Sequence, residues 1–235
     1  MKLPDILEAD RLDEAAALVN KYYTKLYRHG LPQTGSRFDD WDGGGDRVGV
    51  VNSLTANDVL AVSFLSVQVP ASAAIGLLEA NTREVTGLLE KIPADLDLAS
   101  VSLHDYERLL GPNSPASALW QLLRGSENTR WGIGPTTASK IMARKRPRLI
   151  PIFDSVVGPL MGHPTAKGQW ETWHAALTDD SGLPARLQAI KKKSGIEQGI
   201  CDLRTMDVIL WMHGKELGMV LSDDNDDRLV GNSTP

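Results

Sequence analysis

Two glycines around a single apolar residue, with a helix start directly after them, constrain the fold of this chain more than any other feature. Gly132 and Gly134 flank Ile133, and Pro135 follows at the first position of a helical pattern. Glycine permits the positive φ angles of a tight turn and lets another backbone approach closely. The pattern therefore predicts a hairpin between two helices, with a ligand-free helix-joining turn as the alternative.

The helix start after this turn has properties that suit an anion. The amides of Gly134, Thr136 and Thr137 stand where a helix begins, so they have no intrahelical acceptor. The same end of the helix carries a partial positive charge. Such a site binds a phosphate oxygen, which holds a nucleic-acid backbone without reading its sequence.

Basic residues gather around this turn in a chain that is acidic overall. The formal net charge is −5, yet no acid occurs between Asn128 and Phe153. The basic residues of this segment are Arg130, Lys140, Arg144, Lys145, Arg146 and Arg148. A run of charge is usually a solvated face, but beside a phosphate-binding turn it predicts an interface for double-stranded DNA.

A carboxylate follows the basic segment. Asp154 comes after the apolar run Leu149-Ile150-Pro151-Ile152-Phe153 and precedes Ser155. It can cap the next helix, and the cap hydrogen bonds would also help to keep it ionised. It can also be a partly desolvated catalytic carboxylate near the DNA backbone, and the two roles are compatible.

The hydrophobic spacing in the rest of the chain predicts an all-α fold. Helices are expected at 10–28, 59–67, 71–89, 114–123, 134–144, 155–161, 168–178, 184–192 and 205–217. The run 59–67 also fits a buried strand, but the capping-box pattern of Thr55 and Asp58 favours a helix. The stretch 31–48, rich in glycine and aspartate, is interpreted as a linker.

We expect four parts along the chain. Residues 1–50 form an N-terminal helix and a polar loop that pack on the hairpin lobe, and residues 51–130 form a helical lobe. Residues 131–217 form the hairpin lobe with Asp154 and the C-terminal helices. Residues 218–235 are rich in aspartate and are expected to be disordered.

Composition excludes several classes of protein. Cys201 is the only cysteine, so neither an internal disulfide nor a cysteine-based zinc or iron–sulfur site can form. We expect no metal and no other cofactor. No apolar run is long enough to span a bilayer, and the N-terminus lacks the features of a signal peptide. We expect a cytoplasmic protein without a membrane partner, and a monomer.

Two segments resemble the helix-hairpin-helix DNA glycosylase superfamily. The stretch from Gly132 to Ala138 is similar to the family's hairpin Gly-Val-Gly-x-Lys-Thr-Ala, and Asp154 resembles its essential aspartate. The separation of Thr136 and Asp154 (154 − 136 = 18 residues) resembles the family's spacing between its lysine position and that aspartate. Asp58 to Pro70 is similar to a second family segment and places Gln68 on a glutamine near the displaced base.

The resemblance implies two helical lobes with a central cleft, and a DNA glycosylase in which Asp154 is catalytic. The lysine of the family's lyases corresponds to Thr136, which cannot form a Schiff base, so a monofunctional hydrolase is implied. Trp131 and Tyr23 are candidates for the base pocket. The DNA-binding residues would be Gly132, Gly134, Thr136, Thr137, Lys140, Gln68, Arg130, Arg144 and Lys145.

The resemblance also has departures. Ser155-Val156-Val157-Gly158-Pro159 stands where the family has Thr-His-Val-x-Arg, and the family's cysteine cluster is absent. These differences indicate a divergent bacterial branch. The excised base is then either an alkylated base, as in repair, or a hypermodified base such as the glucosylated cytosine of phage DNA, as in antiviral defence.

Two other functions remain open. A non-catalytic helix-hairpin-helix DNA-binding module needs only the turn and the basic residues, with Asp154 as a structural cap. A helical scaffold would instead use the basic face for an acidic partner. Substitution of Gly134 by aspartate should abolish binding in the DNA-binding module, and Asp154 should be dispensable there.

Overall fold

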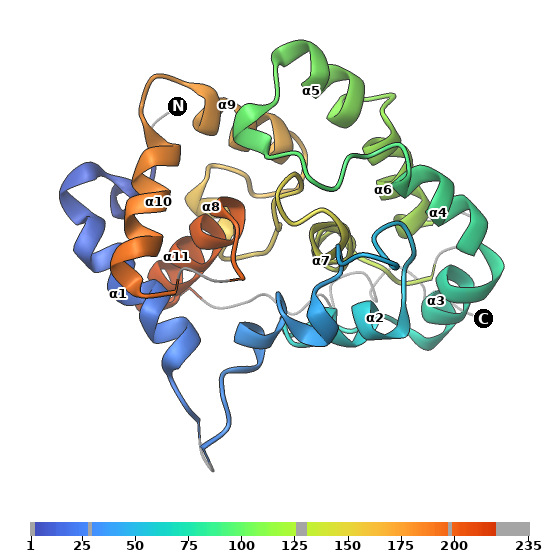
Figure 1. Cartoon of the computed structure of the whole chain (residues 1–235), viewed down its shortest axis with the longest axis horizontal. Coiled ribbons are helices and arrows are strands. Elements are labelled where there is room, and N and C mark those ends of the chain that lie inside the picture. The colour runs from blue at the N-terminus through green and yellow to red at the C-terminus, as the bar shows by residue number, and fades with distance from the viewer. Residues whose placement is uncertain (1–2, 28–29, 126–130, 197–198, 220–235) are drawn as a thin grey trace, which may run out of the picture.

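The computed structural model describes residues 3–27, 30–125, 131–196 and 199–219 (Figure 1), and regular structure in these ranges is helical. One isolated β-bridge joins Leu26 and Pro32. The prediction of an all-α chain is therefore confirmed. The helices are α1 (Leu12–Thr24), α2 (Ala56–Ser63), α3 (Ala71–Ile75), α4 (Thr82–Leu89), α5 (Leu103–Leu110), α6 (Pro115–Arg124), α7 (Pro135–Lys145), α8 (Val157–Leu160), α9 (Gln169–Thr178), α10 (Leu183–Ser194) and α11 (Asp202–Glu216).

Short helical turns connect these helices. They are η1 (Asp5–Leu7), η2 (Ala9–Arg11), η4 (Thr34–Arg37), η5 (Trp41–Gly43), the π-turn η6 (Gly76–Ala80) and η7 (Leu98–Ser100). Within the described ranges, the length and hydropathy of each helix fall short of what a bilayer crossing requires.

The N-terminal helix packs with the C-terminal helices. Helix α1 contacts α10 and α11, and the three lie together at one end of the molecule (Figure 1). Its apolar face, which includes Leu18 and Val19, is buried in this contact. Helix α11 is buried at every residue from Leu203 to Leu210. A helix covered on all sides lies in the core, so each polar residue in this stretch needs an internal partner.

The middle of the chain forms a second group of helices. Helix α4 packs on α6, and both α2 and α6 pack on α7. Helix α7 lies near the centre of the molecule, between the two groups (Figure 1). It is buried from Thr136 to Lys145 although three of these residues are basic, and this burial decides what the basic segment does.

Several local predictions from the sequence are confirmed. Thr55 and Asp58 form the expected reciprocal capping box, with Asp58 N to Thr55 Oγ1 at 3.2 Å and Thr55 N to Asp58 Oδ2 at 3.0 Å. The run after this box is therefore a helix and not a strand, although it ends at Ser63. Ser114 caps α6 by accepting the amide of Ser117 at 3.1 Å.

One other local prediction is wrong, and one helix has no counterpart among the predictions. The expected single helix over 71–89 is divided into α3, the π-turn η6 and α4. At Gly76, in the π-turn, a Cβ would lie 1.8 Å from Cζ3 of Trp131, so the indole packs directly on the backbone there. Helix α5 was not predicted, although Ser102 caps it through the amide of Asp105 at 3.1 Å.

Candidate active site

Two side chains hold the backbone that carries Asp154. Ser139 on α7 accepts the amide of Phe153 at 3.0 Å and lies 3.1 Å from the carbonyl oxygen of the same residue. Gln169 on α9 donates from Nε2 to the carbonyl of Ile152 at 2.6 Å. All these groups are buried. The extended segment before Asp154 is therefore fixed between α7 and α9.

The carboxylate of Asp154 uses one oxygen to cap the next turn. Oδ1 accepts the amides of Val156 at 2.9 Å and Val157 at 2.8 Å, which confirms the expected cap role. The residue is 4% exposed. The second oxygen, Oδ2, makes no hydrogen bond to any residue that the structure describes. The cap therefore orients the carboxylate and leaves one oxygen available to a ligand.

A small cavity lies at Asp154. Its volume is about 110 Å³, well below the roughly 300–1,000 Å³ of sites for drug-sized ligands. We call it the Asp154 pocket. It is lined by Tyr22, Tyr27, Gln33, Thr34, Gly35, Phe64, Leu65, Ser66, Lys140, Ile152, Asp154, Arg204, Asp207, Val208 and Trp211. A cavity of this size and aromatic content suits one small planar group.

Arg204 on α11 organises the polar side of the pocket. Its guanidinium donates to Asp39 Oδ2 at 3.0 Å, to Tyr22 Oη at 2.9 Å and to the carbonyl of Gly35 at 3.0 Å, and it also donates to Asp207 Oδ2. Burial opposes the charge, but the partners, Asp39 foremost, raise the pKa of Arg204 above its ordinary value. The arginine thus stays a fixed cation in the core.

Asp207, also on α11, is the second carboxyl group of the pocket. Its Oδ2 pairs with Arg204, whereas its buried Oδ1 has no hydrogen-bond partner among the described residues. Burial raises the pKa of Asp207 to about 6, with a further contribution from the charge of Asp154 and an opposing one from Arg204. Buried polar atoms are rarely left unsatisfied without a reason, so this oxygen marks a place for a ligand or a proton.

Lys140 lines the same pocket from α7. It is 3% exposed, and its Nζ donates to the carbonyl of Leu65 at 3.0 Å. Directly after Leu65, Ser66 adopts a φ of +62°, which is uncommon outside glycine. The turn that ends α2 is thus held against α7 at the edge of the pocket.

An arm with exposed apolar side chains stands beside the pocket. The bridge between Leu26 and Pro32 closes it, and the amide of Tyr27 donates to the carbonyl of Leu31 at 2.7 Å. Leu26 is 59% exposed, Tyr27 52% and Leu31 64%. Tyr27 also lines the pocket. Apolar residues grouped on a surface typically mark an interaction site.

The predicted turn lies close to the segment of Gln68. Gly132 has a φ of +73°, as expected for a tight turn, and a Cβ there would lie 3.3 Å from Pro70. Ile133 is buried, and its carbonyl accepts a hydrogen bond from Arg124 at 3.0 Å. Gln68 itself is exposed.

Helix α7 begins as the sequence indicated. Gly134 precedes it in an extended conformation, and Pro135 occupies its first turn. Thr136 and Thr137 follow and are buried. Arg130 lies outside the described residues.

The expected basic DNA-binding face is wrong for Lys140, Arg144 and Lys145. All three are at most 3% exposed, so they cannot reach a phosphate on the surface. Arg146 is buried as well, and burial lowers its pKa to about 10. Arg148 does reach the surface, where it pairs with Asp97.

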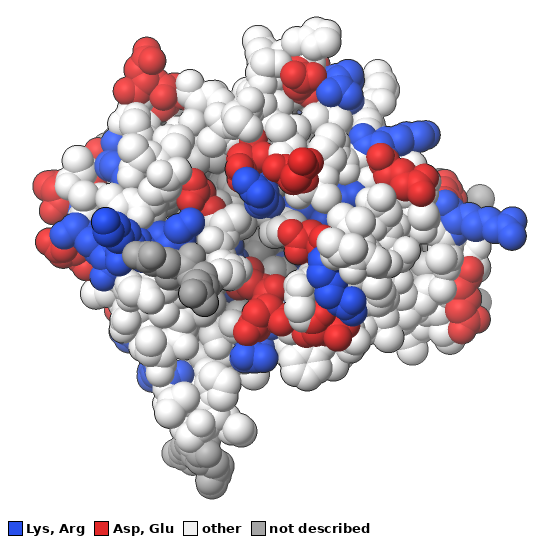
Figure 2. All heavy atoms as spheres, viewed as in Figure 1, with Lys and Arg blue, Asp and Glu red and all other residues white. Residues whose placement is uncertain are grey.

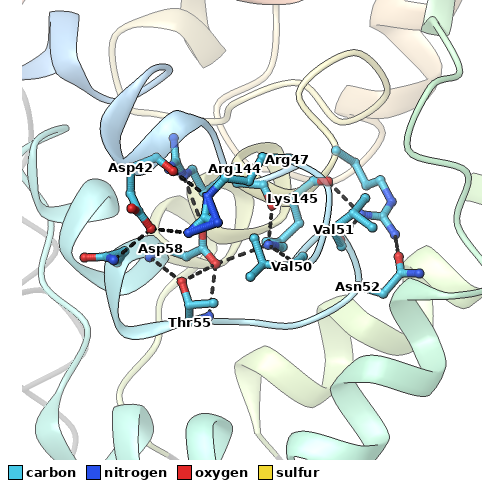
Figure 3. A network of polar contacts seen from close by, with 12 residues as sticks. Asp42, Arg47, Val50, Val51, Asn52, Thr55, Asp58, Arg144 and Lys145 are labelled. Carbon is cyan, nitrogen blue, oxygen red and sulfur yellow. Dashed lines mark hydrogen bonds and ion pairs between the residues drawn. The ribbon is translucent and has the colours of Figure 1, made fainter.

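The buried basic residues hold the 38–52 loop against α7 (Figure 3). Arg144 donates to Asp58 at 3.2 Å and to the carbonyl of Asp39 at 3.0 Å. Lys145 donates to Asp58 at 3.1 Å and to the carbonyl of Val50 at 2.9 Å. The prediction that 31–48 is a linker is therefore wrong for the part from Phe38 onward, which is fixed to α7, whereas Leu31 at the other end is exposed.

Two aromatic candidates are also corrected. Trp131 packs its indole on Gly76 and does not line the Asp154 pocket. Tyr23 donates its hydroxyl to Asp39 at 3.0 Å and is not among the residues that line the pocket. The aromatic residues that do line the pocket are Tyr22, Tyr27, Phe64 and Trp211. Arg204 and Asp207 were missed as site residues, although two charges three positions apart in an apolar helix were a signal.

Two larger cavities have linings that favour a reaction less than that of the Asp154 pocket. One of about 460 Å³ is lined by charged residues that are mostly paired with each other, such as Asp97 with Arg148 and Lys191 with Asp202. Figure 2 shows acidic and basic side chains intermixed over the face in view. The other, of about 640 Å³, lies beside Trp120 and Trp170. Among the described residues, His, Cys, Asp and Glu form no group that could hold a metal ion.

The fold and the pocket define an all-helical protein with a buried pair of carboxyl groups. The chain belongs to the family described as "Family of unknown function (DUF6308)", whose model matches residues 15–214. That span contains every residue of the Asp154 pocket. No curated protein and no solved structure matches the chain.

Proposed function

We propose that the protein is a monofunctional DNA glycosylase that hydrolyses the bond between a base and its sugar at the Asp154 pocket. The observation that carries this proposal is the hydrogen bonding of the buried Asp154 carboxylate. One oxygen of its carboxylate is fixed by two helix amides, and the other has no partner among the described residues. A fixed, buried carboxylate in a cavity suits the stabilisation of a developing positive charge.

The chemistry follows from this geometry. A base inside a duplex is out of reach, so the nucleotide must first rotate into the pocket. Cleavage of the N-glycosidic bond develops positive charge on the sugar, which Asp154 stabilises while it orients or deprotonates the attacking water. Thr136 is no nucleophile for a Schiff base, so the product is an abasic site on an intact strand.

The DNA contacts in this proposal differ from those expected from the basic residues. The backbone is held by the amides of Gly134 and Thr136 at the start of α7, acting as a helix-hairpin-helix with α6. Gln68 and the apolar arm contact the duplex beside the displaced nucleotide. Apolar side chains that enter the stack are a common device in proteins that distort DNA.

The pocket volume bears on the substrate. A cavity of about 110 Å³ is closer to a single base than to a base with an attached sugar. A base without an attached sugar, such as an alkylated base or uracil, is therefore the favoured substrate, and glucosylated cytosine requires the pocket to open.

Abasic-site formation tests the proposal. The purified chain is incubated with unmodified DNA, with duplexes containing N7-methylguanine or uracil, and with phage DNA with and without glucosylated cytosines. Abasic sites are counted with an aldehyde-reactive probe. We expect sites on one substrate class, and a loss of about 10²–10⁴-fold for Asp154→Asn. Asp97→Asn, a surface substitution, is the matched control.

A non-catalytic DNA-binding module is the second candidate, because the cap hydrogen bonds alone explain a buried Asp154. It predicts that no DNA acquires abasic sites and that Asp154→Asn binds a duplex as the wild type does. Gly134→Asp should abolish binding under either function, because it places a negative charge at the phosphate-binding amides.

A further inference from the structure

The Asp154 pocket contains a second carboxyl group, that of Asp207, in addition to the carboxylate of Asp154. Asp207 is 4% exposed and lines the cavity together with Asp154. Its Oδ1 is buried and has no hydrogen-bond partner among the described residues. Two carboxyl groups in one site with different environments are the usual arrangement for an acid and a base that act on the same bond.

We propose that Asp207 is the general acid of this pocket and donates a proton to the leaving base. This inference rests on the glycosylase function proposed above. Asp154 and Asp207 then have different roles. The ionised Asp154 faces the sugar and the water, and the protonated Asp207 faces the base.

The surroundings of the two carboxyl groups explain why their roles differ. Oδ1 of Asp154 accepts two amide hydrogen bonds and acts there as an acceptor only. Asp207 receives no amide hydrogen bond from the described residues and has one oxygen in an apolar, desolvated position. A neutral carboxyl group there can present an O–H donor to a base.

Titratable groups from four parts of the fold act on Asp207. Arg204 lies on the same helix, Lys140 on α7, Asp154 before α8, and Tyr22 on α1. Arg204 also pairs with Asp39 of the 38–52 loop, so its charge is only partly available to Asp207. The net effect of these neighbours and of burial is a carboxyl group that holds its proton at higher pH than an ordinary aspartate.

The step balances in atoms and charge. The bond between the sugar C1′ and the base nitrogen breaks, and its electron pair goes to the base, which takes the proton of Asp207. The water oxygen bonds to C1′, and its proton goes to Asp154. Transfer of that proton through solvent restores both carboxyl groups, so the net reaction consumes one water and gives the free base and an abasic sugar.

A base that is already cationic does not need this proton. N7-methylguanine leaves as a neutral molecule, whereas uracil leaves as an anion unless it is protonated. Asp207→Asn should therefore lower the single-turnover release of uracil by about 10²–10⁴-fold and leave the release of N7-methylguanine within about threefold of the wild type. Asp154→Asn should lower both.

The experiment measures single-turnover base release from each duplex of the panel on which the wild type acts, as a function of pH. For a neutral base, the wild-type rate should fall as pH rises through the pKa of Asp207, near 6, and Asp207→Asn should lack this decline. Asp202→Asn, on the same helix but outside the pocket, is the matched control. A ¹³C NMR titration of the aspartate carboxyl groups, assigned with Asp207→Asn, reports the proton directly.

The outcomes separate the two proposals. A wild-type chain that makes no abasic sites on any DNA overturns the glycosylase function and this assignment with it. An active wild type with equal losses in Asp207→Asn on cationic and neutral bases, or with no loss on a neutral base, overturns the assignment alone. So does a carboxyl group of Asp207 that titrates as an ordinary aspartate. The asparagine keeps an acceptor for Arg204, and circular dichroism of each variant verifies the fold.

Discussion

Substitution of Asp58 by asparagine should destabilise the protein strongly, because this carboxylate neutralises two buried cations. It lies 3.2 Å from Arg144 Nε and 3.1 Å from Lys145 Nζ, and all three side chains are at most 3% exposed. Asparagine has nearly the same shape, and its Oδ1 can still accept the amide of Thr55 in the capping box. The substitution therefore removes the charge and leaves the packing in place.

The magnitude follows from the burial. Removal of one partner from a buried ion pair typically costs about 3–5 kcal/mol, because the remaining charge loses its compensation. Solvent screening provides little relief at this exposure. For a chain of 235 residues, a loss of about 3–5 kcal/mol corresponds to a decrease in Tm of roughly 6–20 °C.

Urea unfolding followed by circular dichroism measures the effect. Asp42→Asn is the matched control, because Asp42 pairs with Arg47 at 36% and 34% side-chain exposure and an exposed pair contributes less than about 1 kcal/mol. A difference of less than about 1 kcal/mol between the two variants would refute the reasoning. Arg144 and Lys145 would then reach solvent, and their role as DNA contacts would have to be restored.

Three further predictions concern the pocket and its surroundings. Burial raises the pKa of Asp207 to about 6 from an ordinary 3.8. The protonated carboxyl group therefore contributes to stability at low pH, and this contribution is lost as pH rises through 6. Relative to Asp207→Asn, the free energy of unfolding of the wild type should decrease by about 3 kcal/mol from pH 3 to pH 8. Gly76→Ala should lower stability by about 1–3 kcal/mol in thermal unfolding, because its Cβ would lie 1.8 Å from the Trp131 ring; no change would mean that the indole moves freely. Leu31→Ser, on the exposed arm, should weaken duplex binding severalfold in a shift assay with unchanged Tm, and unchanged binding would exclude the arm as a DNA contact.

Features that depend on neighbouring residues could be predicted from the sequence. The capping box of Thr55 and Asp58, the Ser114 cap and the positive φ of Gly132 all arise within a few positions along the chain. The cap hydrogen bonds of Asp154 are equally local. Such features need only the chemistry of adjacent side chains and amides, and these are visible in the printed sequence.

The use of the charged residues could not be predicted in this way. The sequence of a basic segment does not reveal whether its side chains face solvent or the core. Arg144 meets Asp58, which is 86 positions away, and the carbonyl of Asp39, which is 105 positions away. Asp58 lies in α2, and the carbonyl of Asp39 belongs to the 31–48 stretch that the sequence indicates as a linker. The packing of this stretch on α7 and the burial of Arg144 therefore depend on each other.

The sequence by itself determined most of the helices, the caps at Thr55 and Ser114 and the orientation of Asp154, because short-range hydrogen bonds and periodicity decide them. Only the tertiary structure decided which charges lie inside. It brought Asp207 to the pocket of Asp154 (207 − 154 = 53 positions apart) and left one of its oxygens without a partner among the described residues. The physical reason is that desolvation depends on everything packed around a group, and the packing of α1, α7 and α11 around this pocket is non-local.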